Sequence, residues 1–246
     1  MPNLRRFGIF LIFFLGINLL PPPSGLATPP ALIGILSPGN GSMVLTPIEL
    51  AAEIQPGGDG LVRVSLLDRQ NNVLARQLIR TNKNIQTPSK LSTHLSFEIP
   101  GESAPALLTI ALQDEYHRPL SLRSVSLTLQ SSGTVNITAA DIDASWLQMY
   151  RPLPHESFSG GGFRVDGRVT PLTQKPVIFE LITDTGGVIG SSQLAVDTPG
   201  EPFDFSIPLS YAFITTQRNV RMVIRQTTDP YGMNVILDSL PLTLAP

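Results

Sequence analysis

Apolar and polar residues alternate along many short stretches of this chain. The clearest stretch is residues 177–182, which is followed by a turn at residues 184–187 and by a second stretch that begins at Val188. Alternation of this kind places successive side chains on opposite faces of a β-strand. Glycine has no side chain to oppose a positive φ angle, so Gly186 and Gly187 suit a tight turn. The pattern predicts a β-hairpin.

The same pattern occurs 115 residues earlier. Residues 62–66 alternate, the chain turns through residues 68–72, and Val73 begins a return strand. Asn71 and Asn72 tolerate left-handed backbone geometry better than most residues do, so they fit a turn of the same kind. The chain is therefore predicted to use this hairpin twice.

The repetition extends beyond the hairpin. About seven short alternating stretches occur in residues 32–130, and a matching series occurs in residues 147–245. Neither part contains a convincing amphipathic helix. Many short strands separated by turn residues are typical of antiparallel β-sandwiches, so we predict an all-β chain with two tandem sandwich domains. The stretches matched by position are 35–38 with 149–152, 48–54 with 163–169, 95–99 with 203–207, 108–112 with 220–224, and 125–129 with 240–244.

Residues 131–146 form the predicted linker between the two domains. Within it, residues 138–141 have the spacing of a helix capping box and are compatible with one short helical turn. We expect this linker to fix the relative orientation of the two domains only loosely.

The first thirty residues carry a different pattern. Arg5-Arg6 precede a continuous apolar run over residues 7–20, which is followed by three prolines and then by small residues at Gly25 and Ala27. This is the three-part pattern of a secretory signal peptide, predicted here as residues 1–27. At ~1.5 Å per residue the apolar run would span only about 21 Å of a bilayer core that is roughly 30 Å thick.

The leading expectation is cleavage after Ala27 and a protein that is secreted or held at the extracytoplasmic cell surface. An uncleaved anchor is the alternative, and the N-terminal segment would then be the contact with the membrane. Export by the twin-arginine route is a further alternative that depends on Arg5-Arg6.

Composition narrows the class of protein. Of the 246 residues, 42% are hydrophobic and 15% are charged, which is typical of a chain that buries a core. The 17 basic and 19 acidic residues give a formal net charge of −2 without a run of like charge, which argues against nucleic-acid binding. The chain has no cysteine, which excludes disulfides and a cysteine-linked lipid anchor and, for an exported protein, mildly favours a bacterial origin.

A shared residue pattern covers nearly the whole mature chain and is found at residues 37–39, 151–154, 161–169, 179–190, 203–208 and 237–239. This pattern resembles the immunoglobulin-like domain of bacterial spore-germination proteins. The first copy has Ala52-Glu53 where the second is read as having Asp166-Gly167. The resemblance implies two immunoglobulin-like sandwiches that serve as a spacer or a binding surface at the cell envelope, and it implies no role in germination itself.

No catalytic, cofactor or metal site is predicted. His94, His117 and His155 lie in separate segments, and none has a second histidine at the spacing of a metal ligand pair. The glycine-rich residues 157–162 open a strand and not a helix, so they lack the helix N-terminus that binds phosphate. No Gly-x-Ser-x-Gly elbow is present.

Acidic residues in and near the linker are candidate calcium ligands. Asp141 and Asp143 lie in the linker, and Asp114, Glu115 or Glu156 are further candidates. Calcium takes about six to eight oxygen ligands, so two carboxylates are too few. We interpret these residues as solvated charges.

Trp146, Met149 and Tyr150 are the most suggestive cluster for recognition, because aromatic side chains at a domain junction can stack on sugar rings. Packing at the junction explains them equally well. We therefore hypothesise an exported, non-enzymatic structural or adhesive module of a bacterial cell envelope, with a carbohydrate-binding accessory protein as the alternative. The partner would be an envelope protein or a polysaccharide, and its binding residues are unknown.

Overall fold

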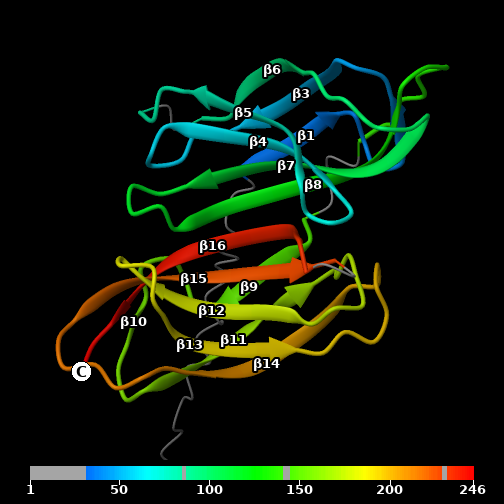
Figure 1. Ribbon diagram of the computed structural model, residues 1–246. Coiled ribbons are helices and arrows are strands. Elements are labelled where there is room, and N and C mark those ends of the chain that lie inside the picture. Colours follow the sequence, from blue (N-terminus) through cyan, green and yellow to red (C-terminus); the bar gives the residue numbers. More distant parts are fainter. Residues whose placement is uncertain (1–31, 85–86, 141–144, 229–231) are drawn as a thin grey trace, which may run out of the picture.

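The computed structural model describes residues 32–84, 87–140, 145–228 and 232–246 (Figure 1). Every regular element in these residues is a β-strand, which confirms the predicted all-β class. No helix in the described ranges is long and apolar enough to cross a bilayer. The predicted signal peptide, residues 1–27, lies outside the described residues, as do Asp141 and Asp143.

The first half forms two facing sheets. One sheet has the order β1-β3-β6, and the other continues through β8-β7-β4-β5, with the short β2 parallel to β8. The strands are β1 (Ile33–Ser37), β2 (Ser42–Val44), β3 (Ile48–Ile54), β4 (Leu61–Asp68), β5 (Val73–Arg80), β6 (Ser89–Leu95), β7 (Ser103–Gln113) and β8 (Pro119–Gln130).

The second half repeats this order strand for strand. One sheet is β9-β11-β14 and the other is β16-β15-β12-β13, with the short β10 parallel to β16. This arrangement of two mainly antiparallel sheets is that of an immunoglobulin-like sandwich, as predicted. The strands are β9 (Leu147–Arg151), β10 (Ser157–Phe158), β11 (Gly162–Val169), β12 (Val177–Thr183), β13 (Val188–Leu194), β14 (Phe203–Ser210), β15 (Arg218–Thr227) and β16 (Asn234–Leu244).

Alternation in the sequence becomes alternation in burial. On β3, Ile48, Leu50 and Ile54 are buried, whereas Glu49 and Glu53 face solvent. Fully burying one such aliphatic side chain contributes about 1.5–3 kcal/mol. Each half has its own hydrophobic cluster, although Leu107 of β7 packs with the cluster of the second half. The predicted domain bounds, 32–130 and 147–245, stay a prediction.

Both predicted hairpins are present and have the same turn. The N–H of Asn71 donates to the carbonyl of Asp68 (3.1 Å), and the N–H of Gly186 donates to the carbonyl of Thr183 (3.0 Å). Asn71 (φ 64°) and Gly186 (φ 83°) are the residues of each turn with a positive φ angle. The two turns lie 115 residues apart, so the predicted repetition holds in backbone detail.

The prediction for the strand at residues 95–99 is wrong. The strand is β6, and residues 96–99 are not in a strand. The sequence was misleading because β6 is an edge strand that carries mostly polar side chains, whereas the apolar residues that follow it lie beyond its end. In register, Leu95 pairs with Ile48 as Leu209 pairs with Phe163, so Leu95 corresponds to Leu209 and not to Phe203.

Other assignments also shift. The register places Leu108 in correspondence with Met222, one strand period beyond the predicted match to Val220. The short strands β2 and β10 were not predicted, and Pro208 lies within β14 and does not end it. Residues 138–140 form no helix, because the N–H of Thr138 bonds to Ser42 Oγ and its carbonyl accepts the N–H of Gly39.

Gly167 marks where the two copies differ inside the core. The register pairs Gly167 with Phe205 and Ala52 with Leu91, so Ala51-Ala52, and not Ala52-Glu53, corresponds to Asp166-Gly167. A Cβ atom on Gly167 would lie 2.6 Å from the carbonyl oxygen of Gln148 and 2.9 Å from the Phe205 ring. The second copy therefore combines a glycine with a large ring, where the first combines an alanine with a smaller side chain.

We expect Gly167→Ala to lower the free energy of unfolding by about 1–3 kcal/mol, because the added methyl group overpacks a site bounded by backbone. Adding Phe205→Leu should recover only part of the loss, since the contact with the Gln148 carbonyl remains. Denaturation in urea measures both. Gly101→Ala is the control, because a Cβ there would meet open space. Equal losses for Gly167→Ala and Gly101→Ala would contradict this account.

Candidate functional site

The two halves are joined edge to edge by their last strands. Strands β8 and β16 pair antiparallel, with Leu122 opposite Leu237 and Ser121 opposite Asp238. One continuous path of strands, β13-β12-β15-β16-β8-β7-β4-β5, therefore runs through both halves (Figure 1). The expectation that only a loose linker relates the two halves is wrong.

This junction has approximate two-fold symmetry. Leu122 and Leu237 lie at its centre and are 115 residues apart, the same separation as the two hairpin turns. The Oγ of Ser124 donates to the carbonyl of Val235 (2.7 Å), and the Oγ of Ser239, which is 115 residues after Ser124, donates to the carbonyl of Leu120 (2.9 Å). Each copy thus presents the same edge, in the same register, to the other.

Asp238 is the most connected side chain of the junction. Its carboxylate accepts two hydrogen bonds from the Arg123 guanidinium (2.8 and 3.0 Å), one from Ser121 Oγ (3.0 Å) and one from Trp146 Nε1 (2.6 Å). Both members of the ion pair are largely buried. Two-pronged pairs of this kind are stronger and more directional than ordinary hydrogen bonds, so they fix the register of β8 on β16.

A second ion cluster forms beside the first. Asp114, in the turn between β7 and β8, binds Nε of Arg118 (2.8 Å) and Nε of Arg221 on β15 (3.3 Å). It also accepts the backbone N–H groups of Tyr116 and Arg118 (both 2.9 Å). Burial would raise the pKa of Asp114, but these hydrogen bonds and the Arg118 charge outweigh it, and the pKa lies below its usual value. Burial lowers the pKa of Arg221, and the charge of Asp114 opposes that shift.

The aromatic cluster singled out in the sequence is not a binding platform. Trp146 is only 2% exposed, and Met149 is completely buried. Tyr150 is partly exposed, and its hydroxyl donates to Asp204 (3.2 Å). Burial at the junction, the other interpretation of these residues, is confirmed for Trp146, whose ring nitrogen binds Asp238. A sugar-stacking surface built from Trp146 and Tyr150 is therefore wrong.

The other candidate residues do not converge. His94 lies on β6, whereas His117 and His155 lie in separate turns, and all three are exposed. Among the described residues no three His, Cys, Asp or Glu side chains lie close enough together to hold a metal ion. Asp114 is engaged by arginines, and Glu156 caps the N–H of Leu153 (2.7 Å). The glycine-rich residues 157–162 contain β10 and lead into β11.

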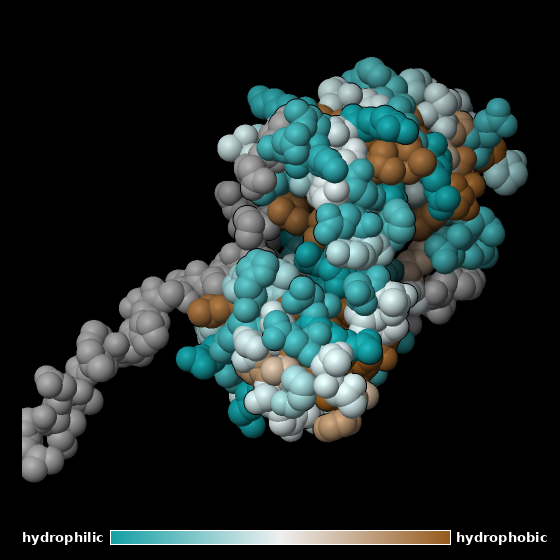
Figure 2. All heavy atoms as spheres, turned by 90° about the vertical axis from the view of Figure 1, so that its left-hand side faces the viewer, coloured by the Kyte–Doolittle hydropathy of each residue, from teal (hydrophilic) through white to brown (hydrophobic). Residues whose placement is uncertain are grey.

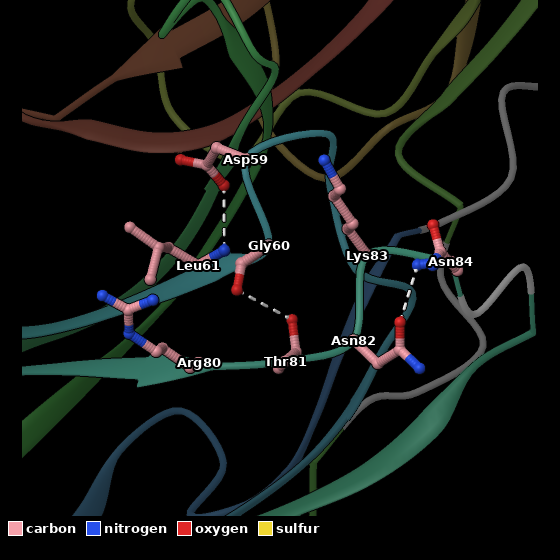
Figure 3. A pocket seen from close by; sticks show the side chains of 8 residues that line it. All are labelled: Asp59, Gly60, Leu61, Arg80, Thr81, Asn82, Lys83 and Asn84. Carbon is pink, nitrogen blue, oxygen red and sulfur yellow. Dashed lines mark hydrogen bonds between the residues drawn. The ribbon is translucent and has the colours of Figure 1, made fainter.

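A polar groove lies where β5 ends. Its volume is 420 Å³, and the side chains that surround it are hydrophilic apart from Leu61 (Figure 3). Asp59 is held by Arg63 (2.6 Å) and by the N–H of Leu61 (2.9 Å). Arg80 and Lys83 form no ion pair with a described carboxylate. The groove is lined by Asp59, Gly60, Leu61, Arg80, Thr81, Asn82, Lys83 and Asn84.

Sequence reasoning missed this groove because residues 76–92 are polar and gave no strand pattern. The structure places residues 76–80 in β5 and residues 89–92 in β6. Seen from the side, hydrophobic side chains form separate patches among hydrophilic ones, and no broad apolar platform is visible on that face (Figure 2).

Comparison with known proteins gives no family. No family model matches the sequence, and no curated protein matches it. Among solved structures, the fibronectin(III)-like modules of Clostridium thermocellum CbhA match at 11% identity over 87% of this chain and 93% of theirs, with a TM-score of 0.25. The titin domains z1z2 in complex with telethonin match at 14% identity over 87% and 95%, with a TM-score of 0.24.

A third match is to extracellular domains 3–5 of Drosophila OTK, at 12% identity over 90% of this chain and 66% of that one, with a TM-score of 0.23. At TM-scores this low, whole-chain superposition is poor. The immunoglobulin-like assignment rests on the strand order within each half.

We expect Asp114→Asn to destabilise the protein near neutral pH by about 1–3 kcal/mol, because the arginines lose their buried anion. A carboxyl group with a lowered pKa stabilises the folded state above its unfolded pKa, about 3.9, and that stabilisation is lost as the pH falls through the folded value. The difference between wild type and variant should therefore narrow below about pH 4. Urea titrations at several pH values measure it, and the exposed Asp197→Asn serves as control. A difference that stays constant with pH would contradict the assignment.

Proposed function

We propose that this chain is an exported, non-enzymatic structural or adhesive module of a bacterial cell envelope, in which the two sandwiches act as one stiff unit. The observation that carries the proposal is the junction of β8 and β16, where strand pairing and the Arg123–Asp238 ion pair lock two similar halves together. Two domains joined only by a flexible linker would need neither the strand pairing nor the ion pair. A stiff unit suits a spacer that holds a binding surface at a set distance from the cell.

We propose a role without catalysis. Among the described residues no three His, Cys, Asp or Glu side chains lie close enough together to hold a metal ion, Asp238 accepts a hydrogen bond from Ser121 Oγ, and Glu156 accepts one from the N–H of Leu153. Immunoglobulin-like sandwiches serve many functions, so the fold alone does not choose between a spacer and a binding protein. That the two sandwiches are related to the immunoglobulin-like domain of spore-germination proteins is a hypothesis.

The partner is proposed to be an envelope protein or a polysaccharide. The polysaccharide alternative loses its aromatic platform, because Trp146 is buried and occupied by Asp238. A protein partner is therefore the better supported of the two.

The absence of cysteine allows a direct test of stiffness, because two introduced cysteines can be spin-labelled without background. With labels at the exposed positions Glu49 and Ser191, we expect one narrow distance distribution by pulsed electron spin resonance. Asp238→Ala should broaden it, since Arg123 is left without its anion, whereas Arg168→Ala, which removes an exposed ion pair, should not. A broad distribution in the wild type would reject the stiff unit.

Export is tested by mass spectrometry of the protein made from the full sequence in a bacterial host. We expect the mature chain to begin at Thr28 and to be recovered outside the cytoplasm, because residues 1–27 have the pattern of a cleaved signal peptide. Replacing Leu11 and Phe13 by Asp should abolish export. An intact N-terminus on a cytoplasmic protein would contradict the proposal.

A further inference from the structure

The two copies differ at the outer edges of the two strands that end the continuous sheet path. One end is β13 and the other is β5, which are the corresponding strands of the two halves. The outer edge of β13 is partly closed: Gly190 forms a bridge with Tyr211, and the N–H of Ala212 donates to the carbonyl of Ile189 (2.8 Å). No corresponding bridge or backbone hydrogen bond covers β5 in the described residues.

A single residue accounts for part of this difference. A Cβ atom on Gly190 would lie 2.5 Å from the carbonyl oxygen of Ser210, so only glycine permits the close crossing. The corresponding residue, 115 positions earlier, is Ala75. Its methyl group is incompatible with the same crossing, and the edge of β5 stays open.

The backbone groups on the open edge follow from the ladder. The N–H of Thr81 donates to the carbonyl of Gly60 (2.9 Å), so it points toward β4. Backbone groups alternate in direction along a strand, and those of Arg76, Leu78 and Arg80 therefore point away from β4. An open edge of this kind can pair with another extended chain.

The side chains around this edge are basic and partly apolar. Leu78 is 59% exposed and Val73 is 47% exposed. From residue 62 to residue 95 the chain has six basic residues (Arg63, Arg69, Arg76, Arg80, Lys83 and Lys90) and one acidic residue (Asp68). The matching residues 177–209 have no basic residue and five acidic ones (Glu180, Asp184, Asp197, Glu201 and Asp204).

We propose that β5 is a docking edge for an extended acidic segment of a partner protein, which adds to the sheet as a further strand. Backbone hydrogen bonds would supply affinity, and carboxylates of the partner would meet Arg76, Arg80 and Lys83. The polar groove of Figure 3 continues from the end of β5 and receives the end of the segment, with Arg80 and Lys83 in its lining.

Charge and edge geometry together select this partner. A cationic patch alone would suit any anionic polymer, but an open strand edge requires a peptide backbone. A second copy of this chain offers acidic residues around β13, yet that edge is partly occupied by residues 211–212. The inference names the partner class of the adhesive function proposed above, and it can fail while the stiff, exported unit stands.

The test uses the mature chain and a fluorescent eight-residue peptide of alternating Glu and Val, with binding followed by fluorescence anisotropy. We expect saturable binding that weakens with salt, little binding of the Lys-Val counterpart, and loss of binding when alternate peptide nitrogens are methylated. Arg76→Glu with Arg80→Glu should weaken binding about tenfold or more. The matched control combines Ser191→Glu on β13 with Ala195→Glu, one residue beyond the end of β13, and should leave binding unchanged.

A second pair of variants separates strand addition from charge. Leu78→Pro removes one outward N–H and should abolish binding, because proline is tolerated on an edge but cannot donate. Gln193→Pro, at the matching position of β13, should not affect binding, and thermal unfolding verifies that both variants fold. The proposal would be overturned if the methylated peptide bound equally well. It would also be overturned if heparin competed fully while Leu78→Pro left binding unaffected. Sedimentation that shows a dimer, dissociated by Leu78→Pro, would overturn it as well.

Discussion

The pairing of Arg123 with Asp238 is the constraint on which the arrangement of the two halves depends. Both residues occupy the same position of the repeated pattern, 115 residues apart, next to the approximate two-fold axis at Leu122 and Leu237. Two identical copies meeting this way would place like charges together, which is destabilising. Because the charges at this position are opposite, β8 pairs more favourably with β16 than either strand would pair with a second copy of itself. The junction therefore favours the pairing of the two halves within one chain.

Strand edges explain the rest of the architecture. A sandwich exposes backbone donors and acceptors at the edge of each sheet, and natural proteins protect such edges. Here the last strand of each half protects the other, and residues 211–212 partly cover β13. Strand β5 keeps its edge open and has Arg76 and Arg80 on it, which discourages association with itself while leaving an acidic chain able to bind.

The sequence predicted those strands and hairpins in which apolar and polar residues alternate locally. The buried residues of β3 and the two hairpins alternate strongly, and both were found where expected. Strand β6 was misplaced because an edge strand with Ser, Thr and Lys has no apolar period to detect. The junction was not foreseen because Ser121 and Asp238 are polar residues within long strands, and no local pattern encodes a contact between positions 117 residues apart.

The two copies differ in core packing and in surface charge, and these two differences have different causes. In the core, Ala52 beside Leu91 becomes Gly167 beside Phe205, so a change at one position is matched by a change at its neighbour and the packed volume is kept. The charge difference between residues 62–95 and 177–209 has no such partner, because the described ion pairs do not join Arg76, Arg80 or Lys83 to acidic residues. Packing cannot have driven a difference between solvent-facing side chains. The two halves therefore share a backbone and differ in surface charge, and we attribute this charge difference to a partner that binds one half.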